Sequence, residues 1–258
     1  MPRNSVALIT GAASGIGRAV ALMQARAGRP VALLDVDEGN ANSVAAEAKE
    51  QGSPEVLALT ADISSETAVA QAFEECRKSL GVPTRVVANA GIEISGKAHE
   101  TETADWNRVI DVNLTGTFIT CREAVRLLLG HKVPGSVVCL SSPSAVVGFA
   151  GGSNSAYGSS KGGISALVRA LAIDYASAGI RVNGVVPGAT ETPLLDVVSP
   201  DGAGIAERAK SQIPLGRMAR PEEIAEAVDW LLGPKASYVT GSHLYVDGGL
   251  TARGANDF

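Results

Sequence analysis

The chain is poor in the residues from which disulfide frameworks and metal sites are built. It contains only three cysteines and three histidines among 258 residues. The cysteines are widely spaced and form no CxxC pair, which indicates buried free thiols in a reducing compartment. The histidines show no metal-ligand spacing, so we predict that the protein holds no metal.

Charge and long apolar runs are also scarce. Charged residues make up 19% of the chain and the net charge is −5, with no basic run. This excludes the electrostatic footprint of nucleic-acid or anionic-lipid binding. No stretch approaches the roughly 18 apolar residues of a membrane helix, and the first apolar run is too short for a signal peptide. We therefore expect a cytoplasmic protein that binds neither nucleic acid nor membrane.

What the chain does have is a regular alternation of two kinds of segment. Short β-branched runs predict buried strands over residues 5–10, 30–35, 55–60, 85–89, 135–141, 180–186 and 242–246. Alanine-rich stretches predict helices over residues 15–28, 40–51, 66–80, 105–129 (one helix or two end to end), 155–178 and 221–232. Near-continuous apolar strands separated by helices indicate an α/β fold: a doubly wound, Rossmann-like parallel sheet of about seven strands in a single domain.

The segment 191–214 departs from this alternation. Its prolines and glycines interrupt any long helical period. A long irregular stretch inside a compact domain is usually a lid or a binding loop. We predict that this segment covers the substrate.

A glycine-rich turn follows the first predicted strand directly. Residues 10–17 read TGAASGIG and lead into a predicted helix. Glycines allow a tight turn and a close approach of the backbone to a pyrophosphate, and a helix N-terminus offers free N–H donors. A glycine turn alone is weak evidence, but its place between strand and helix predicts nucleotide binding.

The second predicted strand ends in a carboxylate, Asp35. At this position an acidic side chain can accept hydrogen bonds from both hydroxyls of an adenosine ribose. It would also repel a 2′-phosphate, at a cost on the order of several kcal/mol in a partly desolvated site. Asp35 therefore predicts NAD rather than NADP as the cofactor.

A tyrosine and a lysine stand four residues apart in a predicted helix. Tyr157 and Lys161 share one helical face at this spacing. A tyrosine is a poor acid or base at neutral pH, and a neighbouring ammonium favours its phenolate form. Alone, this spacing is common by chance, and an amphipathic helix with a half-buried tyrosine and a solvated lysine explains it better.

Together, these motifs resemble the short-chain dehydrogenase/reductase family, in its NAD-preferring branch. The resemblance spans residues 1–258 as one domain and also includes the segments NAG at 89–91, PG at 187–188 and VDGG at 246–249. It implies a catalytic set of Asn113, Ser142, Tyr157 and Lys161. It implies cofactor contacts from Gly11, Ser14, Gly15, Ile16, Gly17, Asp35, Val36, Asp62, Ile63, Asn89, Ala90, Gly91, Tyr157, Lys161, Pro187, Gly188, Thr190 and Thr192.

The resemblance also implies a role for each catalytic residue. Tyr157 resembles the general acid/base, and Lys161 the residue that lowers the pKa of the tyrosine and holds the nicotinamide ribose. Ser142 resembles the hydroxyl that stabilises the substrate oxygen. Asn113 resembles the asparagine that bends a helix and anchors a water of the proton relay.

The serine assignment leaves one alternative open. The loop before Tyr157 is two residues longer than the family pattern, so counting back from Tyr157 selects Ser144, whereas counting forward from the strand selects Ser142. We prefer Ser142, because a hydroxyl at the carboxyl end of a parallel strand is positioned by the sheet. Pro143 supports the choice, since it biases Ser142 towards an extended backbone.

The sequence thus predicts an oxidoreductase that transfers a hydride between NAD(H) and a small secondary alcohol or ketone. Two rivals are an NADPH-dependent 3-oxoacyl-thioester reductase of the same family and a non-catalytic dinucleotide-binding sensor. The family resemblance implies a homotetramer, with helical pairing by residues 113–129 and 155–178 and a second contact through residues 243–246. We expect residues 92–101, 145–154 and 191–214 to select the substrate.

Overall fold

The computed structural model describes residues 5–149, 154–198, 204, 207 and 211–254. Its centre is one sheet of seven parallel strands in the order β3-β2-β1-β4-β5-β6-β7. The strands are β1 (Val6–Thr10), β2 (Val31–Asp35), β3 (Val56–Thr60), β4 (Pro83–Ala88), β5 (Gly135–Leu140), β6 (Ile180–Pro187) and β7 (His243–Val246). The predicted doubly wound sheet is confirmed.

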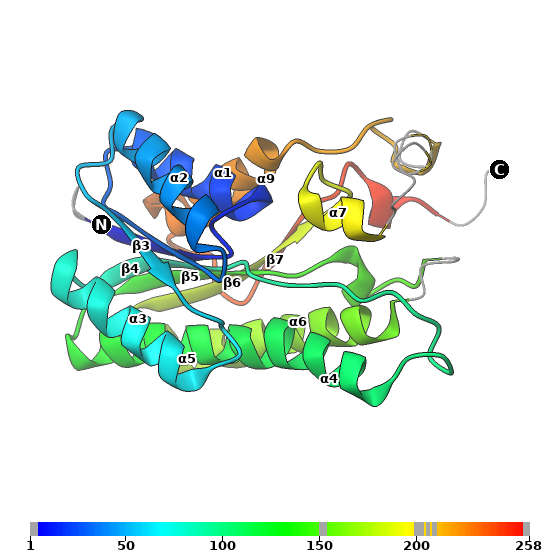
Figure 1. The fold of residues 1–258 in the computed structure, drawn as a ribbon, viewed down its shortest axis with the longest axis horizontal. Helices are drawn as coiled ribbons and strands as arrows, with labels where there is room; N and C mark the ends of the chain where they lie inside the picture. Colours follow the sequence, from blue (N-terminus) through cyan, green and yellow to red (C-terminus); the bar gives the residue numbers. More distant parts are fainter. Residues whose placement is uncertain (1–4, 150–153, 199–203, 205–206, 208–210, 255–258) are drawn as a thin grey trace.

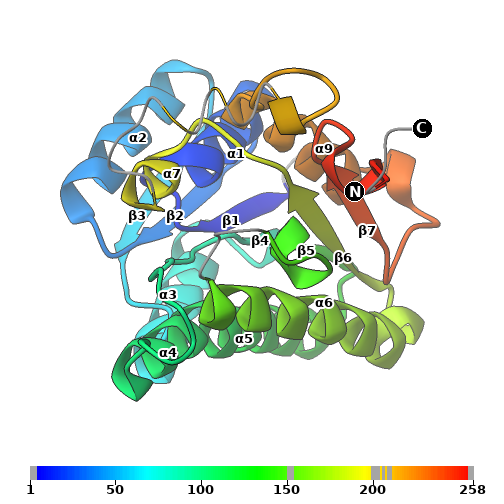
Figure 2. The same cartoon turned by 90° about the vertical axis from the view of Figure 1, so that its right-hand side faces the viewer.

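Helices cover both faces of this sheet (Figures 1 and 2). One layer holds α1 (Gly15–Arg26), α2 (Glu38–Glu50) and α9 (Pro221–Leu232). The other holds α3 (Glu66–Ser79), α4 (Thr103–Ile110), α5 (Gly116–Gly130) and α6 (Ser155–Tyr175). The short α7 (Pro193–Val198) lies beyond the end of β6, on the side of the sheet that carries α1.

Alternation along each strand divides the apolar side chains between two cores. Leu8 of β1 packs with Phe73 and Ile164 on the α3–α6 side, whereas its neighbour Ile9 packs with Leu231 on the α9 side. Both faces of a parallel sheet are thereby buried, which explains why its strands are apolar throughout.

The segment 105–129, predicted as one helix or two, forms two α-helices joined by a short π-helix. A π-helical segment, Asp111–Thr115, lies between α4 and α5 and contains the fully buried Asn113. Such an insertion widens the helix locally and is frequent at functional sites. The two-helix interpretation is therefore the correct one.

The segment 191–214 is less irregular than predicted. Part of it is α7, which begins at Pro193, where the fixed backbone angle of proline suits a first helical turn. Residues 199–203, 205–206 and 208–210 lie outside the described part of the chain.

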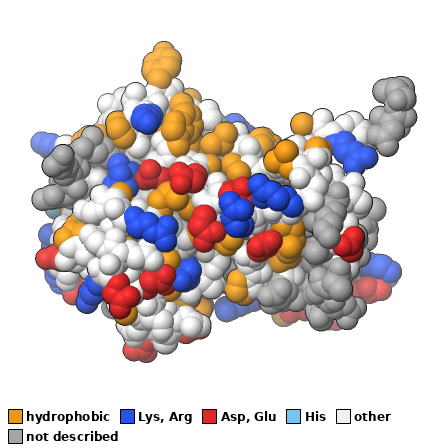
Figure 3. All heavy atoms as spheres, turned by 90° about the horizontal axis from the view of Figure 1, so that it is seen from above, with side chains coloured by type: hydrophobic (Ala, Val, Ile, Leu, Met, Phe, Trp, Pro, Cys, Tyr) orange, Lys and Arg blue, Asp and Glu red, His pale blue; other side chains and the backbone are white. Residues whose placement is uncertain are grey.

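The face covered by α1, α2 and α9 carries acidic and basic side chains side by side (Figure 3). Ion pairs account for part of this mixture: Arg18 of α1 pairs with Glu47 of α2, and Arg217 pairs with Glu223 of α9. Among the described helices, none is both long and apolar enough to cross a membrane.

Candidate active site

Two adjoining cavities open at the carboxyl ends of the strands. Their volumes are about 260 and about 420 Å³, and four residues line both: Ile16, Asn89, Thr192 and Leu194. β1 pairs with β2 on one side and with β4 on the other, so the order of the sheet reverses here. Ligands of open α/β sheets bind at such a switch point.

The glycine turn after β1 forms one wall of the first cavity. Gly11 and Gly15 have φ of +63° and +51°, values that L side chains rarely adopt. A Cβ at Gly17 would collide with the carbonyl oxygen of Gly11. Each glycine is therefore required, two by their backbone angles and one by packing. The Ser14 hydroxyl makes no capping hydrogen bond, which leaves the first-turn N–H groups of α1 without a side-chain acceptor.

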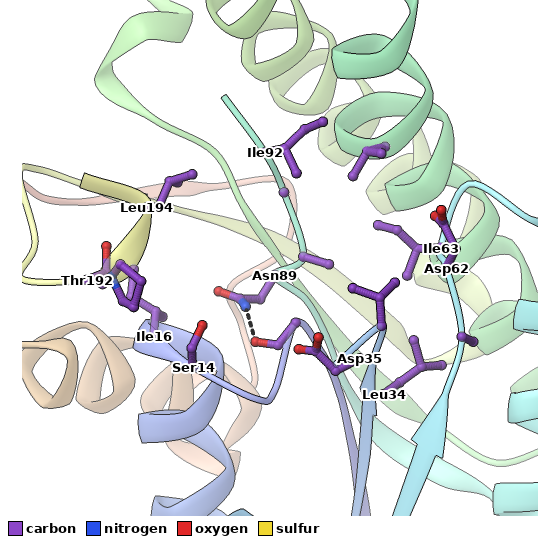
Figure 4. A pocket seen from close by; sticks show the side chains of 18 of the residues that line it. Ser14, Ile16, Leu34, Asp35, Asp62, Ile63, Asn89, Ile92, Thr192 and Leu194 are labelled. Carbon is purple, nitrogen blue, oxygen red and sulfur yellow. Dashed lines mark hydrogen bonds between the residues drawn. The ribbon is translucent and has the colours of Figure 1, made fainter. Parts of the chain in front are cut away.

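Asn89 fastens this turn to the end of β4. Its Nδ2 donates to the carbonyl oxygen of Thr10 at 3.0 Å and to that of Gly11 at 3.0 Å (Figure 4). In return, the Thr10 hydroxyl accepts hydrogen bonds from the backbone N–H groups of Asn89 and Ala90, at 3.0 and 3.2 Å. The Asn89 amide group therefore holds the glycine turn in its conformation.

Asp35, at the end of β2, lines the first cavity (Figure 4). Its carboxylate accepts hydrogen bonds from the Ala13 N–H at 2.9 Å and from the Asp37 N–H at 3.0 Å. The first bond ties the end of β2 to the glycine turn, and the second fixes the carboxylate against the backbone that follows β2. The carboxylate is thereby held in place before any ligand binds.

Asp62 and Ile63 lie on the loop after β3, beside Asp35 in the first cavity (Figure 4). The Asp62 carboxylate accepts hydrogen bonds from the backbone and hydroxyl of Ser64 and pairs with Arg108 at 3.6 Å. Burial raises the pKa of Asp62, but the Ser64 and Arg108 contacts outweigh it and lower the pKa overall.

The predicted cofactor residues divide between the two cavities. The first is lined by Gly11, Ser14, Gly15, Ile16, Asp35, Val36, Asp62, Ile63, Asn89, Ala90, Gly91 and Thr192. The second is lined by Ile16, Asn89, Tyr157, Lys161, Pro187, Gly188, Thr190 and Thr192. Gly17 lines neither, because it packs beneath the turn against Gly11 and Asn89.

Lys161 lies at the floor of the second cavity and is 4% exposed. Its ammonium donates to the carbonyl oxygen of Leu140 at 2.8 Å and lies 5.4 Å from the centre of the Tyr157 ring. The alternative of a solvated lysine on an amphipathic helix is excluded. The helix α6 instead directs both side chains at the end of β5.

Ser142 continues β5 into the second cavity with an extended backbone, φ −161° and ψ 155°. The preceding Ser141 is buried and donates to the Lys161 carbonyl at 3.1 Å, and its hydroxyl lies 2.9 Å from that of Ser165. These contacts tie the strand end to α6. They place the Ser142 hydroxyl near enough to the Tyr157 hydroxyl to lower its pKa.

Ser144 lines the same cavity but is engaged elsewhere. Its hydroxyl accepts a hydrogen bond from Nδ2 of Asn154 at 3.2 Å, and its N–H donates to the Ser142 hydroxyl at 3.2 Å. The geometry supports Ser142 as the hydroxyl that faces Tyr157.

Asn113 lines neither cavity. Its side chain accepts a hydrogen bond from the Ile92 N–H at 2.8 Å and donates to the Ile92 carbonyl at 2.9 Å and to the Ser160 hydroxyl at 3.1 Å. It therefore clamps the segment after β4 onto α6.

In the protein without cofactor, the pKa of Tyr157 is shifted upwards, whereas the sequence led us to expect that Lys161 would lower it. Burial raises the pKa of Tyr157, and the charge of Glu93 raises it further, while Ser142 lowers it. Burial also lowers the pKa of Lys161 to about 8, against the opposing effects of Cys139 and Glu93. Desolvation disfavours both charged forms and is the largest cause of each pKa shift.

Each of the three segments expected to select the substrate contributes to the second cavity: Glu93 comes from 92–101, Asn154 from 145–154 and Gln212 from 191–214. Sequence reasoning missed Arg108, which lines the first cavity and pairs with Asp62. Arg108 reaches this cavity only through tertiary contacts, so no local sequence signal could have found it.

Comparisons with known proteins agree with this architecture. A family model described as enoyl-(acyl carrier protein) reductase matches residues 11–251. The cis-4-hydroxycyclohexanecarboxylate dehydrogenase of Sinomonas cyclohexanicum is 40% identical, with 96% of each chain covered. The 3beta-hydroxysteroid dehydrogenase 1 of Eggerthella lenta is 36% identical, over 96% of this chain and 94% of the relative.

A solved structure is also similar over nearly the whole length. The short-chain type dehydrogenase/reductase from Mycobacterium marinum superimposes with a TM-score of 0.92 at 33% identity, with 96% of each chain covered. The sheet order, the glycine turn at the switch point and these likenesses agree: the chain belongs to the short-chain dehydrogenase/reductase family.

Proposed function

We propose that this protein is an NAD-dependent dehydrogenase of small secondary alcohols, working in reverse as a ketone reductase. The observation that carries the proposal is the convergence of Ser142, Tyr157 and Lys161 on one cavity that adjoins the glycine cradle. Hydroxyl, phenol and ammonium groups are thereby gathered where a dinucleotide and a carbonyl compound can meet.

The first cavity fits a dinucleotide. Gly11 and Gly15 line it without side chains, so the backbone itself forms this part of the surface. A Cβ at Gly15 would come within 3.0 Å of the Thr192 side chain, which lines the same cavity. First-turn N–H groups of α1 would hold the pyrophosphate, and Asp35 would accept the ribose hydroxyls. When bound, the nicotinamide supplies the hydride acceptor or donor.

The residues of the second cavity divide the remaining work. In alcohol oxidation the phenolate oxygen of Tyr157 takes the proton of the substrate hydroxyl, and in ketone reduction the Tyr157 phenol donates its proton to the carbonyl oxygen. Ser142 donates a hydrogen bond to that oxygen as charge develops on it. The Lys161 ammonium favours the phenolate form of Tyr157. In the protein alone, burial raises the pKa of Tyr157; a bound oxidised nicotinamide would bring a positive charge that favours the phenolate in the same direction as Lys161.

The cavity also supports a choice of substrate size and polarity. It is lined partly by Pro143, Phe149, Leu195, Ile213 and Leu250. Among the lining residues that the structure describes, no arginine is present to receive the phosphate of a thioester's pantetheine arm. This favours a small, neutral substrate over the 3-oxoacyl thioester of the rival interpretation. The names of the two relatives, a hydroxycyclohexanecarboxylate and a hydroxysteroid dehydrogenase, support a ring-borne secondary alcohol.

The test is a turnover assay with paired cofactors, followed at the nicotinamide absorbance over a panel of cyclic secondary alcohols and ketones. We expect kcat/KM with NAD to exceed that with NADP at least tenfold, a ratio that needs only about 1.4 kcal/mol. Asp35→Ala should reduce this preference mainly by weakening NAD binding. Glu38→Ala removes a nearby exposed carboxylate outside the cavity and should leave the preference unchanged.

Two results would contradict the proposal in different ways. Equal use of both cofactors by the wild type would remove the role of Asp35. Tight NADH binding without turnover on any alcohol or ketone would favour a dinucleotide-binding sensor.

A further inference from the structure

One carboxylate faces the substrate cavity and has no part in the chemistry described so far. Glu93 is half-buried and lines the second cavity together with Ser142, Tyr157 and Lys161. Among the lining residues that the structure describes, it is the only carboxylate, and Lys161 is the only cation. A charged side chain in such a place requires a physical account, because a buried charge without a partner is costly.

The segment that carries Glu93 is held rigidly on both sides. The neighbouring Ile92 is bound through both its N–H and its carbonyl by the Asn113 side chain. Gly96, three residues further on, pairs as a parallel bridge with Asn154 at the start of α6. Glu93 is therefore fixed between two anchors, and its carboxylate is preorganised relative to Tyr157.

Within the described residues, no lysine or arginine forms an ion pair with this carboxylate. The groups that face it are the Asn154 amide, the Lys161 ammonium and the Tyr157 phenol. Asn154 also donates to Ser144, and Lys161 donates to the Leu140 carbonyl. A carboxylate has about four lone-pair sites. Glu93 can therefore still accept hydrogen bonds from a ligand in the cavity.

We infer that Glu93 determines specificity by accepting a hydrogen bond from a second, non-reacting hydroxyl of the substrate, so that the enzyme favours diols and polyols over mono-alcohols and disfavours anionic substrates. The inference rests on the proposed function and assigns the substrate class of that site. Once ionised, a carboxylate only accepts hydrogen bonds, so a hydroxyl is a complementary partner and a substrate carboxylate is repelled.

A neutral hydroxyl suits the cavity better than an ammonium group. Lys161 already supplies one positive charge there, and a bound oxidised nicotinamide would add a second. An amino alcohol would bring a third positive charge into the same desolvated space, whereas a hydroxyl satisfies Glu93 without changing the net charge.

The test compares four kinds of ring alcohol that differ in the remote group: cyclohexanol, the 1,2-, 1,3- and 1,4-cyclohexanediols, cis-4-hydroxycyclohexanecarboxylate and 4-aminocyclohexanol. For the wild type we expect kcat/KM of the best diol to exceed that of cyclohexanol about tenfold or more, which is the usual range for a hydrogen bond to a charged group. The hydroxy acid should be oxidised less efficiently than cyclohexanol.

Substitution of Glu93 should change these ratios in a defined way. Glu93→Gln keeps the size and an acceptor oxygen but removes the charge, so the disadvantage of the hydroxy acid should shrink about tenfold. Glu93→Ala should remove the preference for the diol. Glu100→Gln removes an exposed carboxylate on the same segment, away from the cavity, and should change neither ratio.

A second readout does not depend on turnover. Calorimetric titration of the NADH-bound protein with the preferred diol should show weaker binding to Glu93→Ala, with little difference for cyclohexanol. Thermal unfolding and NADH affinity report whether a variant is folded and able to bind its cofactor.

Each outcome bears on one hypothesis or on both. Unchanged substrate ratios in a folded, active Glu93→Gln and Glu93→Ala would overturn this inference and leave the proposed function standing. A wild-type preference for 4-aminocyclohexanol over every diol would overturn the choice of a neutral hydroxyl. A wild type that oxidises none of these alcohols would overturn the proposed function and this inference together.

Discussion

At the scale of single residues, the site depends on hydrogen bonds that hold side chains in place before a ligand arrives. Ser141 ties the end of β5 to α6, and Asn113 ties the segment after β4 to the same helix. Ser142 and Tyr157, which belong to different elements, are thereby brought to one cavity. Positioning of this kind is what allows a weak donor such as a serine hydroxyl to stabilise a developing charge.

The two serines of this loop should respond differently to substitution. Ser142→Ala removes the hydroxyl beside Tyr157 and should lower kcat on the order of a hundredfold or more, with little change in NADH affinity. Ser144→Ala removes an acceptor of the Asn154 amide and should change kcat less than about tenfold. Steady-state kinetics together with NADH fluorescence titration measure both effects. The reverse ranking would transfer the catalytic role to Ser144.

At the scale of elements, we propose that the segment 191–214 closes over the cofactor and substrate. Thr192 and Leu194, at the start of this segment, line both cavities, and Leu195 lines the second. The helix α7 has only six residues, too few to be stable without tertiary contacts. Because α7 lies at the mouth of the cavities, contacts with a bound ligand would stabilise it.

Hydrogen exchange tests this closure. Amide exchange of peptides from residues 191–214 should slow when NADH and a substrate analogue bind together, because low local stability is raised by new contacts. Peptides from α5, remote from the cavities, provide the internal control. Exchange that stays the same in 191–214 on binding both ligands would argue against a lid.

At the scale of the whole molecule, large apolar side chains remain exposed in two regions. Phe118 and Ile173, on α5 and α6, are 41% and 80% exposed, and Trp230, Tyr238 and Tyr245, on or near α9 and β7, are at least 41% exposed. Exposed aromatic and aliphatic side chains in groups are typical of protein interfaces. These regions coincide with the two contacts that the family resemblance implied, and we propose that they join four copies of the chain.

Light scattering on a size-exclusion column measures this assembly directly. We expect a particle of four 26.3 kDa chains at micromolar concentration. Ile173→Glu should disrupt one contact and Tyr245→Glu the other, each yielding a dimer, because an isologous contact places the charge twice at every two-fold axis. Glu222→Gln, an exposed change at the start of α9, should leave the tetramer intact. A wild type that elutes as a monomer would refute the assembly.

Much of this protein was determined by local sequence alone. The parallel sheet could be predicted because its apolar, β-branched strands can be recognised from a few consecutive residues. The dinucleotide cradle could be predicted because a tight turn needs glycine at positions 11, 15 and 17, and because Asp35 directly ends a strand. The extended backbone that Pro143 was expected to impose on Ser142 is observed, whereas the choice of Ser142 over Ser144 as the catalytic hydroxyl stays a prediction.

Other features were decided only by the tertiary structure. The burial of Lys161 and the partial burial of Tyr157 depend on α6 packing against β5. They reverse the expected direction of the tyrosine pKa shift in the protein alone. Asn113 acts as a clamp because Ile92 and Ser160, distant in sequence, meet it in space. Glu93 faces the substrate cavity for the same reason. Spacing along a chain encodes turns and helical faces, but desolvation and long-range hydrogen bonds exist only once separate elements have packed together.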